Sequence, residues 1–145
     1  MINLLAILAD LYIPLLIITW LFYLYQQESN RGGEIKVLLL SLVLVYSLML
    51  LDNYFNIWPA WGLDYSTHSA VALIFVVNLT GRNRILKLLA PLSLFAYCAL
   101  MRFLNYHSFV DTLSTLLVLL PALIYWQKRL KINTGLWKEW FNNRF

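Results

Sequence analysis

Five apolar blocks, each near the length of a bilayer-spanning helix, follow one another along the chain. They cover about residues 3–25, 35–51, 65–79, 85–103 and 107–126. A membrane helix needs roughly 20 mostly apolar residues, and the third block is the shortest of the five. Pro91 and Pro121 lie inside the last two blocks, where membrane helices tolerate proline. The pattern predicts an all-α membrane bundle of five transmembrane helices.

The segments between and after the blocks are those expected at a membrane surface. Residues 26–34 are polar and contain two glycines, a strong turn signal. Tyr54, Trp58 and Trp61 belong to an aromatic stretch typical of the headgroup level, so we expect them to anchor the protein there. We interpret residues 1–127 as a single transmembrane domain.

A basic tail follows the last block. It places four large apolar side chains on one helical face, as an interfacial helix does: Leu136, Trp137, Trp140 and Phe141. We interpret residues 128–145 as a basic cytoplasmic interfacial tail. Its cations are more typical of a topology signal than of a binding site.

Composition excludes several classes of protein. With 61% apolar and 12% charged residues in 145, the chain is too apolar for a soluble domain of this size. The net charge of +4 does not indicate nucleic-acid binding, because the basic residues lie in loops beside the spans. The single cysteine, Cys98, lies inside an apolar block, so it forms no intrachain disulfide and no CxxC motif. No cofactor is predicted.

Charge also predicts orientation. Five spans place ten of the eleven basic residues on one side, which the positive-inside rule makes cytoplasmic: Arg31, Lys36, Arg82, Arg84, Lys87, Lys128, Arg129, Lys131, Lys138 and Arg144. The N-terminus is then outside and the C-terminus cytoplasmic. We expect an integral protein of a bacterial inner (cytoplasmic) membrane, with its site facing the periplasm.

The opposite, outer half holds the side chains that can act as acids, bases or nucleophiles. They are both histidines, all four aspartates and the remaining cation: His68, His107, Asp10, Asp52, Asp64, Asp111 and Arg102. Scattered polar residues would have no reason to share one leaflet, and ionisable groups near membrane depth usually have a function. This segregation predicts one polar site at the outer mouth.

His107 and Asp111 are the core of that prediction. They are four residues apart, so on a helix they share a face and the carboxylate can reach the ring. A histidine oriented by a carboxylate is a nucleophile or general base. His68 would supply a proton to the leaving group, and Arg102 would hold a phosphate. Together these roles describe phosphoryl transfer through a phosphohistidine.

The same residues resemble the type 2 phosphatidic acid phosphatase superfamily of lipid phosphatases and phosphotransferases. Its second motif is Pro-Ser-Gly-His, and residues 65–68 read Tyr-Ser-Thr-His. Its third motif is Ser-Arg, five residues, His, three residues, Asp, which Arg102, His107 and Asp111 match except for the serine and a one-residue shift. The resemblance implies that His107 is the nucleophile, Asp111 its orienter and His68 the general acid. It also implies that Arg102 and Ser66 bind the phosphate.

The first family motif, Lys, six residues, Arg-Pro, is changed. Leu51 and Trp58 stand where the family has its cations, and only Pro59 is kept. We therefore expect either a lipid phosphatase or phosphotransferase of the outer leaflet, or a catalytically inactive member of that fold. The inactive protein would bind a lipid or a membrane protein partner. The sequence does not choose among lipid phosphates.

Two other interpretations of the polar residues stay open. His107 and Asp111 could form a structural pair that locks helices together, as intramembrane polar residues often do. Alternatively, two pairs with a spacing of four could bind zinc in a metal-dependent membrane hydrolase: Asp64, His68, His107 and Asp111. No His-Glu-x-x-His signature accompanies this second possibility. Asp10 is too isolated along the chain to be assigned a role.

Overall fold

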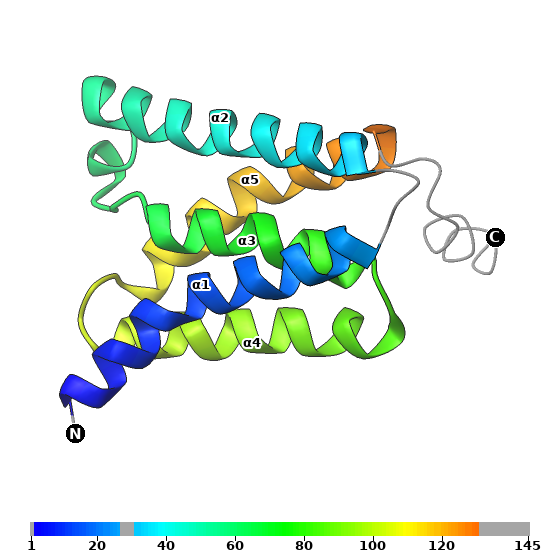
Figure 1. Ribbon diagram of the computed structural model, residues 1–145. Coiled ribbons are helices and arrows are strands. Elements are labelled where there is room, and N and C mark those ends of the chain that lie inside the picture. The colour runs from blue at the N-terminus through cyan, green and yellow to red at the C-terminus, as the bar shows by residue number, and fades with distance from the viewer. Residues whose placement is uncertain (1, 27–30, 131–145) are drawn as a thin grey trace, which may run out of the picture.

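The computed structural model describes residues 2–26 and 31–130, and within them every regular element is helical. The elements are α1 (Ile2–Gln26), α2 (Arg31–Phe55), the short 3-10 helix η2 (Pro59–Trp61), α3 (Thr67–Thr80), α4 (Arg84–Phe103) and α5 (Phe109–Leu130) (Figure 1). Each predicted apolar block corresponds to one α-helix. The predicted all-α class is confirmed, and the interfacial helix predicted at residues 136–141 lies outside the described residues.

Four of these helices, α1, α2, α4 and α5, are long and apolar enough to cross a membrane. Their lengths and compositions are consistent with an integral membrane protein. The fifth, α3, has only 14 residues. At 1.5 Å per residue it is about 21 Å long, shorter than the roughly 30 Å of a bilayer's hydrocarbon core. The five predicted spans are therefore four helices of membrane length and one shorter apolar helix.

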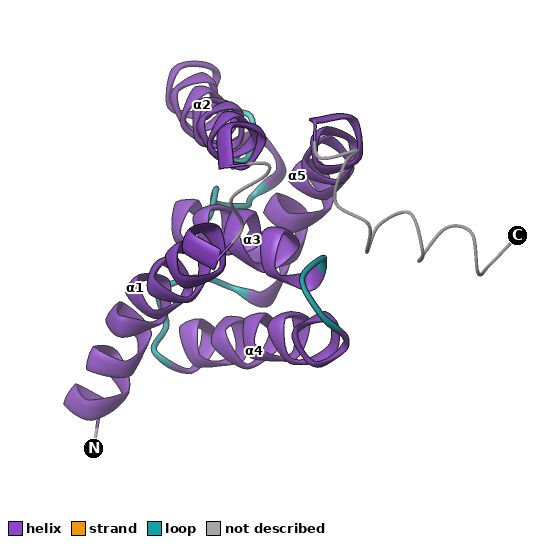
Figure 2. Ribbon diagram, turned by 45° about the vertical axis from the view of Figure 1, so that its right-hand side comes forward, coloured by secondary structure: helices purple, strands orange, loops and turns teal. Residues whose placement is uncertain are grey.

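The short helix α3 occupies the centre of the bundle, with α1, α2, α4 and α5 around it (Figure 2). Nearly every residue from Ser69 to Leu79 is buried. A helix that is apolar on all sides must be surrounded by protein or lipid, and here the four longer helices surround it. One such contact is the edge-on packing of Trp20 in α1 against Phe75, with ring centroids 6.0 Å apart. The core of the protein thus follows the axis of α3.

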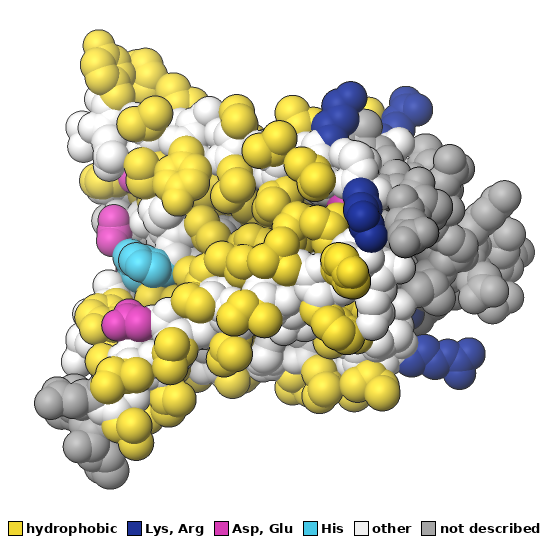
Figure 3. Space-filling model, viewed as in Figure 1, with side chains coloured by type: hydrophobic (Ala, Val, Ile, Leu, Met, Phe, Trp, Pro, Cys, Tyr) yellow, Lys and Arg dark blue, Asp and Glu magenta, His cyan; other side chains and the backbone are white. Residues whose placement is uncertain are grey.

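Polar and charged groups divide between the two ends of the bundle. On the face shown in Figure 3, histidine and acidic side chains gather at the left-hand end, and lysine and arginine side chains lie at the right-hand end. The right-hand end also contains an ion pair between Arg82 and the buried Glu34, at 2.6 Å. The left-hand end contains two loops, residues 56–66 and 104–108, and these loops carry the candidate site.

Candidate functional site

The first turn of α5 is built on a reciprocal pair of hydrogen bonds between Ser108 and Asp111. The backbone N–H of Asp111 donates to Ser108 Oγ at 3.1 Å, and the backbone N–H of Ser108 donates to Asp111 Oδ2 at 2.7 Å. This is a capping box, which satisfies two backbone donors that a helix start leaves unpaired. A negative side chain here also opposes the positive end of the helix dipole. The local sequence Ser-Phe-Val-Asp therefore starts the helix after His107.

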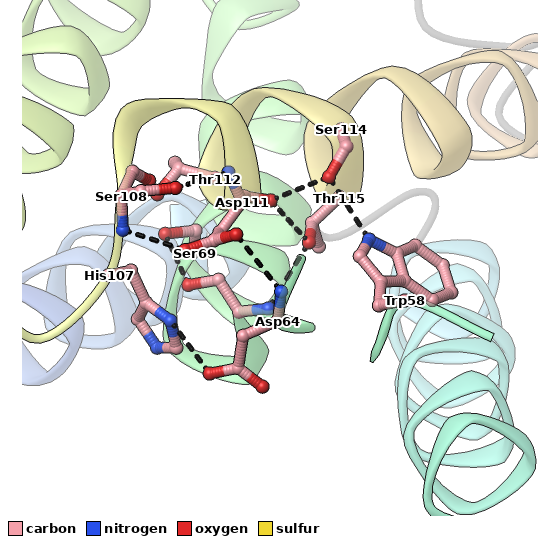
Figure 4. A network of polar contacts seen from close by, with 10 residues as sticks. Trp58, Asp64, Ser69, His107, Ser108, Asp111, Thr112, Ser114 and Thr115 are labelled. Carbon is pink, nitrogen blue, oxygen red and sulfur yellow. Dashed lines mark hydrogen bonds and ion pairs between the residues drawn. The ribbon is translucent and has the colours of Figure 1, made fainter. Parts of the chain in front are cut away.

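The same end of α5 holds the loop that precedes α3 (Figure 4). The backbone N–H of Asp64 donates to Asp111 Oδ1 at 2.9 Å, and the backbone N–H of Ser66 donates to Thr115 Oγ1 at 3.1 Å. Thr115 and Asp111 are both buried. Buried backbone donors need partners, and α5 supplies them through side chains one turn apart. The two loops that carry the candidate residues are therefore fixed to each other.

Trp58 is a third attachment point, and it is buried in the protein and not exposed as an interface anchor would be. It is only 7% exposed, its indole Nε1–H donates to Ser114 Oγ at 3.0 Å, and its backbone N–H donates to Asp52 Oδ1 at 2.7 Å. Ser114 in α5 thus binds the ring, and Asp52 in α2 binds the backbone. Tyr54 and Trp61, by contrast, are about four-fifths exposed, as interface anchors would be.

Tyr65 packs edge-on against Trp58, with ring centroids 5.0 Å apart. Its hydroxyl donates to the backbone carbonyl of Val45 in α2 at 3.1 Å. Burial, together with the nearby charge of Asp52, raises the pKa of Tyr65 to about 12. The phenol therefore stays a protonated donor. Together these contacts make the loop between α2 and α3 a packed part of the bundle.

His107 lies in the loop before α5, and its contact differs from the one expected. Its Nδ1 is 3.2 Å from Oδ2 of Asp64, and 13% of its side chain is exposed. The ring N–H is not aligned well enough to count as a hydrogen bond, and within residues 2–26 and 31–130 Nδ1 has no other partner. The predicted pairing with Asp111 assumed that both residues lie on one helix. Because α5 begins at Phe109, the histidine turns to Asp64 instead.

The other predicted site residues lie at this same end but make separate contacts. Arg102, in the last turn of α4, is exposed and donates to Asn105 Oδ1 at 3.2 Å. His68 is exposed in the first turn of α3. Ser66 is fully buried, and its hydroxyl donates to Ser69 Oγ at 2.9 Å. The structure thus gives Ser66 a packing contact, and its role as a phosphate ligand stays a prediction.

The alternative metal site needs at least three ligands to converge. Across the described ranges, no three His, Cys, Asp or Glu side chains are grouped to hold a metal ion. In particular, both oxygens of Asp111 accept backbone hydrogen bonds, which withdraws that carboxylate from the predicted set. The described residues thus show no grouped ligand set, and the zinc alternative stays a prediction.

Sequence reasoning missed three residues that shape this site: Ser108, Ser114 and Thr115. It placed Asp64 in the polar site but did not pair it with His107. One signal was readable, because Ser-x-x-Asp before an apolar run is a capping-box pattern. Ser114 and Thr115 gave no signal, since their partners lie about 50 residues earlier in the chain.

Comparisons with protein-family models, curated proteins and solved structures found no match for this chain. The resemblance to the type 2 phosphatidic acid phosphatase superfamily therefore depends on the motif residues alone. The class that the fold defines is an all-helical protein with four helices of membrane length and a polar site at one end of the bundle.

Proposed function

We propose that this protein is a membrane phosphatase or phosphotransferase that acts on a lipid phosphate through a phosphohistidine on His107. The observation that carries the proposal is the pairing of His107 Nδ1 with Asp64 Oδ2, 3.2 Å apart, at one end of a bundle of membrane-length helices. A carboxylate beside one ring nitrogen favours the proton there and leaves the lone pair on the other, Nε2. Such a histidine can act as a nucleophile.

The reaction proceeds in two steps that balance. In the first, the Nε2 lone pair of His107 attacks phosphorus, the bond between phosphorus and the lipid oxygen breaks, and the leaving oxygen takes a proton from protonated His68. In the second, water or an acceptor alcohol attacks phosphorus, the phosphorus–nitrogen bond breaks and its electron pair returns to Nε2. His68 takes the proton of the attacking oxygen. The sum is hydrolysis or transfer of one phosphoryl group.

Placement in the membrane supports the choice of a lipid substrate. If the four long helices cross the bilayer, the loops that carry His68 and His107 lie at headgroup depth. The basic residues at the other end of the bundle make that end cytoplasmic under the positive-inside rule. We infer an outside N-terminus, a cytoplasmic C-terminus and a site that faces the periplasm of a bacterial inner membrane. The exposed Arg102 would exchange Asn105 for phosphate oxygens.

The test is phosphate release by purified protein from phosphatidate, a phosphatidylglycerol phosphate and a polyprenyl pyrophosphate, with chelator present. Wild type is compared with His107→Ala and His68→Ala, and Asn53→Ala, at an exposed polar residue of the same end, serves as a control. We expect release by wild type and the control, none by His107→Ala and slow release by His68→Ala. A trapped phosphoprotein should be absent in His107→Ala. No release from any substrate by folded wild type would contradict the proposal for these lipids.

The exposed carboxylate of Asp10 favours a second candidate function. In this function the protein is a non-catalytic subunit that binds a membrane protein partner. Asp10 lies six positions after Leu4, where the membrane-length part of α1 begins, so it is about 9 Å along the helix axis. Its side chain is exposed, and it has no hydrogen bond or ion pair within the described chain. A charge facing lipid is costly. A lysine or arginine in a partner's membrane helix at the same depth would neutralise it.

Energy transfer between labelled protein and synthetic membrane peptides tests this candidate. One peptide is a leucine-rich helix with a single lysine about 9 Å from its outer end, and the other has leucine at that position. We expect transfer to the lysine peptide by wild type and its loss in Asp10→Asn. Equal transfer to both peptides would show that Asp10 is not a docking residue.

A further inference from the structure

Asp64 and Asp111 both lie beside the loop that carries His107, and their carboxylates make different contacts (Figure 4). Asp111 is buried, and its two oxygens accept the backbone N–H groups of Asp64 and Ser108 at 2.9 and 2.7 Å. Asp64 has a side chain that is 67% exposed, and it points its Oδ2 at Nδ1 of His107. Asp111 also lies within electrostatic range of His107, but its carboxylate is occupied by backbone donors, whereas Asp64 directs its carboxylate at the ring.

We propose that Asp64 is the positioning residue of His107, and that Asp111 serves to hold the backbone of Asp64 in place. This inference rests on the proposed function, because it assigns the carboxylate that prepares the proposed nucleophile. It moves the orienting role, which the sequence pattern gave to Asp111, to Asp64. His107 would then be oriented by the loop before α3, and not by its own helix.

The geometry explains why Asp64, and not Asp111, contacts His107. An aspartate at the third position of a helix that begins after Ser108 is drawn to the capping box, where it meets two backbone donors. Carboxylates with charge-assisted hydrogen bonds to backbone groups are strongly held. Turning Asp111 to His107 would take the side-chain acceptor away from two part-buried backbone N–H groups, those of Asp64 and Ser108. No comparable loss opposes the contact of the exposed Asp64 side chain with the ring.

The chemical consequence concerns the two nitrogens of the ring. With Asp64 at Nδ1, the neutral ring carries its proton on that nitrogen, and Nε2 has the lone pair that attacks phosphorus. As the phosphorus–nitrogen bond forms, the ring becomes positive, and the Asp64 carboxylate stabilises that charge. The contact is 3.2 Å and imperfectly aligned in the free protein. Catalytic hydrogen bonds often tighten only when substrate binds.

The tautomer of His107 tests the inference independently of turnover. The chain has only two histidines, so the nitrogen NMR signals of His107 are assigned by comparison with His68→Ala. We expect neutral His107 to be protonated on Nδ1 in wild type and to lose that preference in Asp64→Ala. Asn53→Ala, which removes an exposed polar side chain from the same end, should leave the tautomer unchanged. Asp64→Ala keeps the backbone N–H that Asp111 accepts, so the fold should persist.

Turnover supplies the second measurement. If wild type releases phosphate, Asp64→Ala should lower kcat on the order of 10²-fold with KM little changed, and Asp64→Glu should restore part of it. Asp111→Asn should lower the melting temperature, and it should lower kcat of the folded fraction less than Asp64→Ala does. Failure of the proposed function would appear as no turnover by wild type, with the NMR result still deciding the role of Asp64. An Nδ1–H tautomer that survives in Asp64→Ala, but is lost in folded Asp111→Asn, would overturn the inference.

Discussion

The indole Nε1–H of Trp58 donates to Oγ of Ser114 at 3.0 Å, which joins the loop after α2 to the second turn of α5. Ser114 Oγ in turn donates to the backbone carbonyl of Asp111 at 2.9 Å. The contact therefore links the aromatic stretch to the residue that caps α5 and holds Asp64. The Trp58–Ser114 contact reaches the candidate site only through Asp111.

Removing this hydrogen bond should weaken the end of the bundle that carries the candidate site. Trp58→Phe keeps an aromatic ring but loses the N–H, and Ser114→Ala loses the acceptor. Ser114→Ala leaves the buried indole N–H without a partner, which costs about 1–3 kcal/mol, and Trp58→Phe loses the hydrogen bond itself, so each change should lower the melting temperature in detergent. If the two residues act through one bond, the double variant should be less destabilised than the sum of the single variants. Strict additivity would show that the contact contributes nothing.

The capping box makes a separate prediction for α5. Ser108→Ala removes the acceptor of the Asp111 N–H and should destabilise the protein by about 0.5–2 kcal/mol. Ser108→Thr keeps a hydroxyl and serves as the control. Hydrogen exchange should accelerate at the first turn of α5 and in the loop before α3, because Asp111 joins the two. Faster exchange confined to α5 would mean that the loop is held by other contacts.

At the opposite end, the ion pair of Glu34 and Arg82 should be costly to break. Only 1% of the Glu34 side chain and 9% of the Arg82 side chain are exposed. Replacing one partner of a buried pair leaves the other charged and desolvated, which costs about 3–5 kcal/mol. Arg82→Met should therefore lower stability far more than Lys36→Met, which removes an exposed cation from the same end of the bundle. Similar melting temperatures for the two variants would argue against a stabilising pair.

The helices were largely predictable, because their apolar blocks have the length that a bilayer requires. The central position of α3 was not. A short, uniformly apolar helix looks the same in sequence whether lipid or protein surrounds it. Its burial follows from the four longer helices, which offer it enclosing surfaces on every side. Length was the available signal, since 14 residues are too few to cross a hydrocarbon core unaided.

The candidate site was predictable in location but not in its contacts. The pattern placed His107, Asp111 and Ser66 at one end, and the structure brings their loops together. Spacing by four assumed a continuous helix, whereas the Ser108 cap starts α5 two residues after the histidine. A cap and a catalytic orienter compete for the same carboxylate. Sequence spacing alone does not say which of the two uses Asp111.

Orientation in the membrane gives the last prediction. Trp61 is 81% exposed at the end that carries the histidines, and Arg84 is exposed at the start of α4, at the opposite end. With Cys98 replaced by alanine, a membrane-impermeant thiol reagent should label Trp61→Cys in intact cells. It should label Arg84→Cys only after the membrane is permeabilised. This follows because positive charge is retained on the cytoplasmic side. The reverse pattern would place both histidines in the cytoplasm and remove an outer-leaflet phosphate from consideration as the substrate.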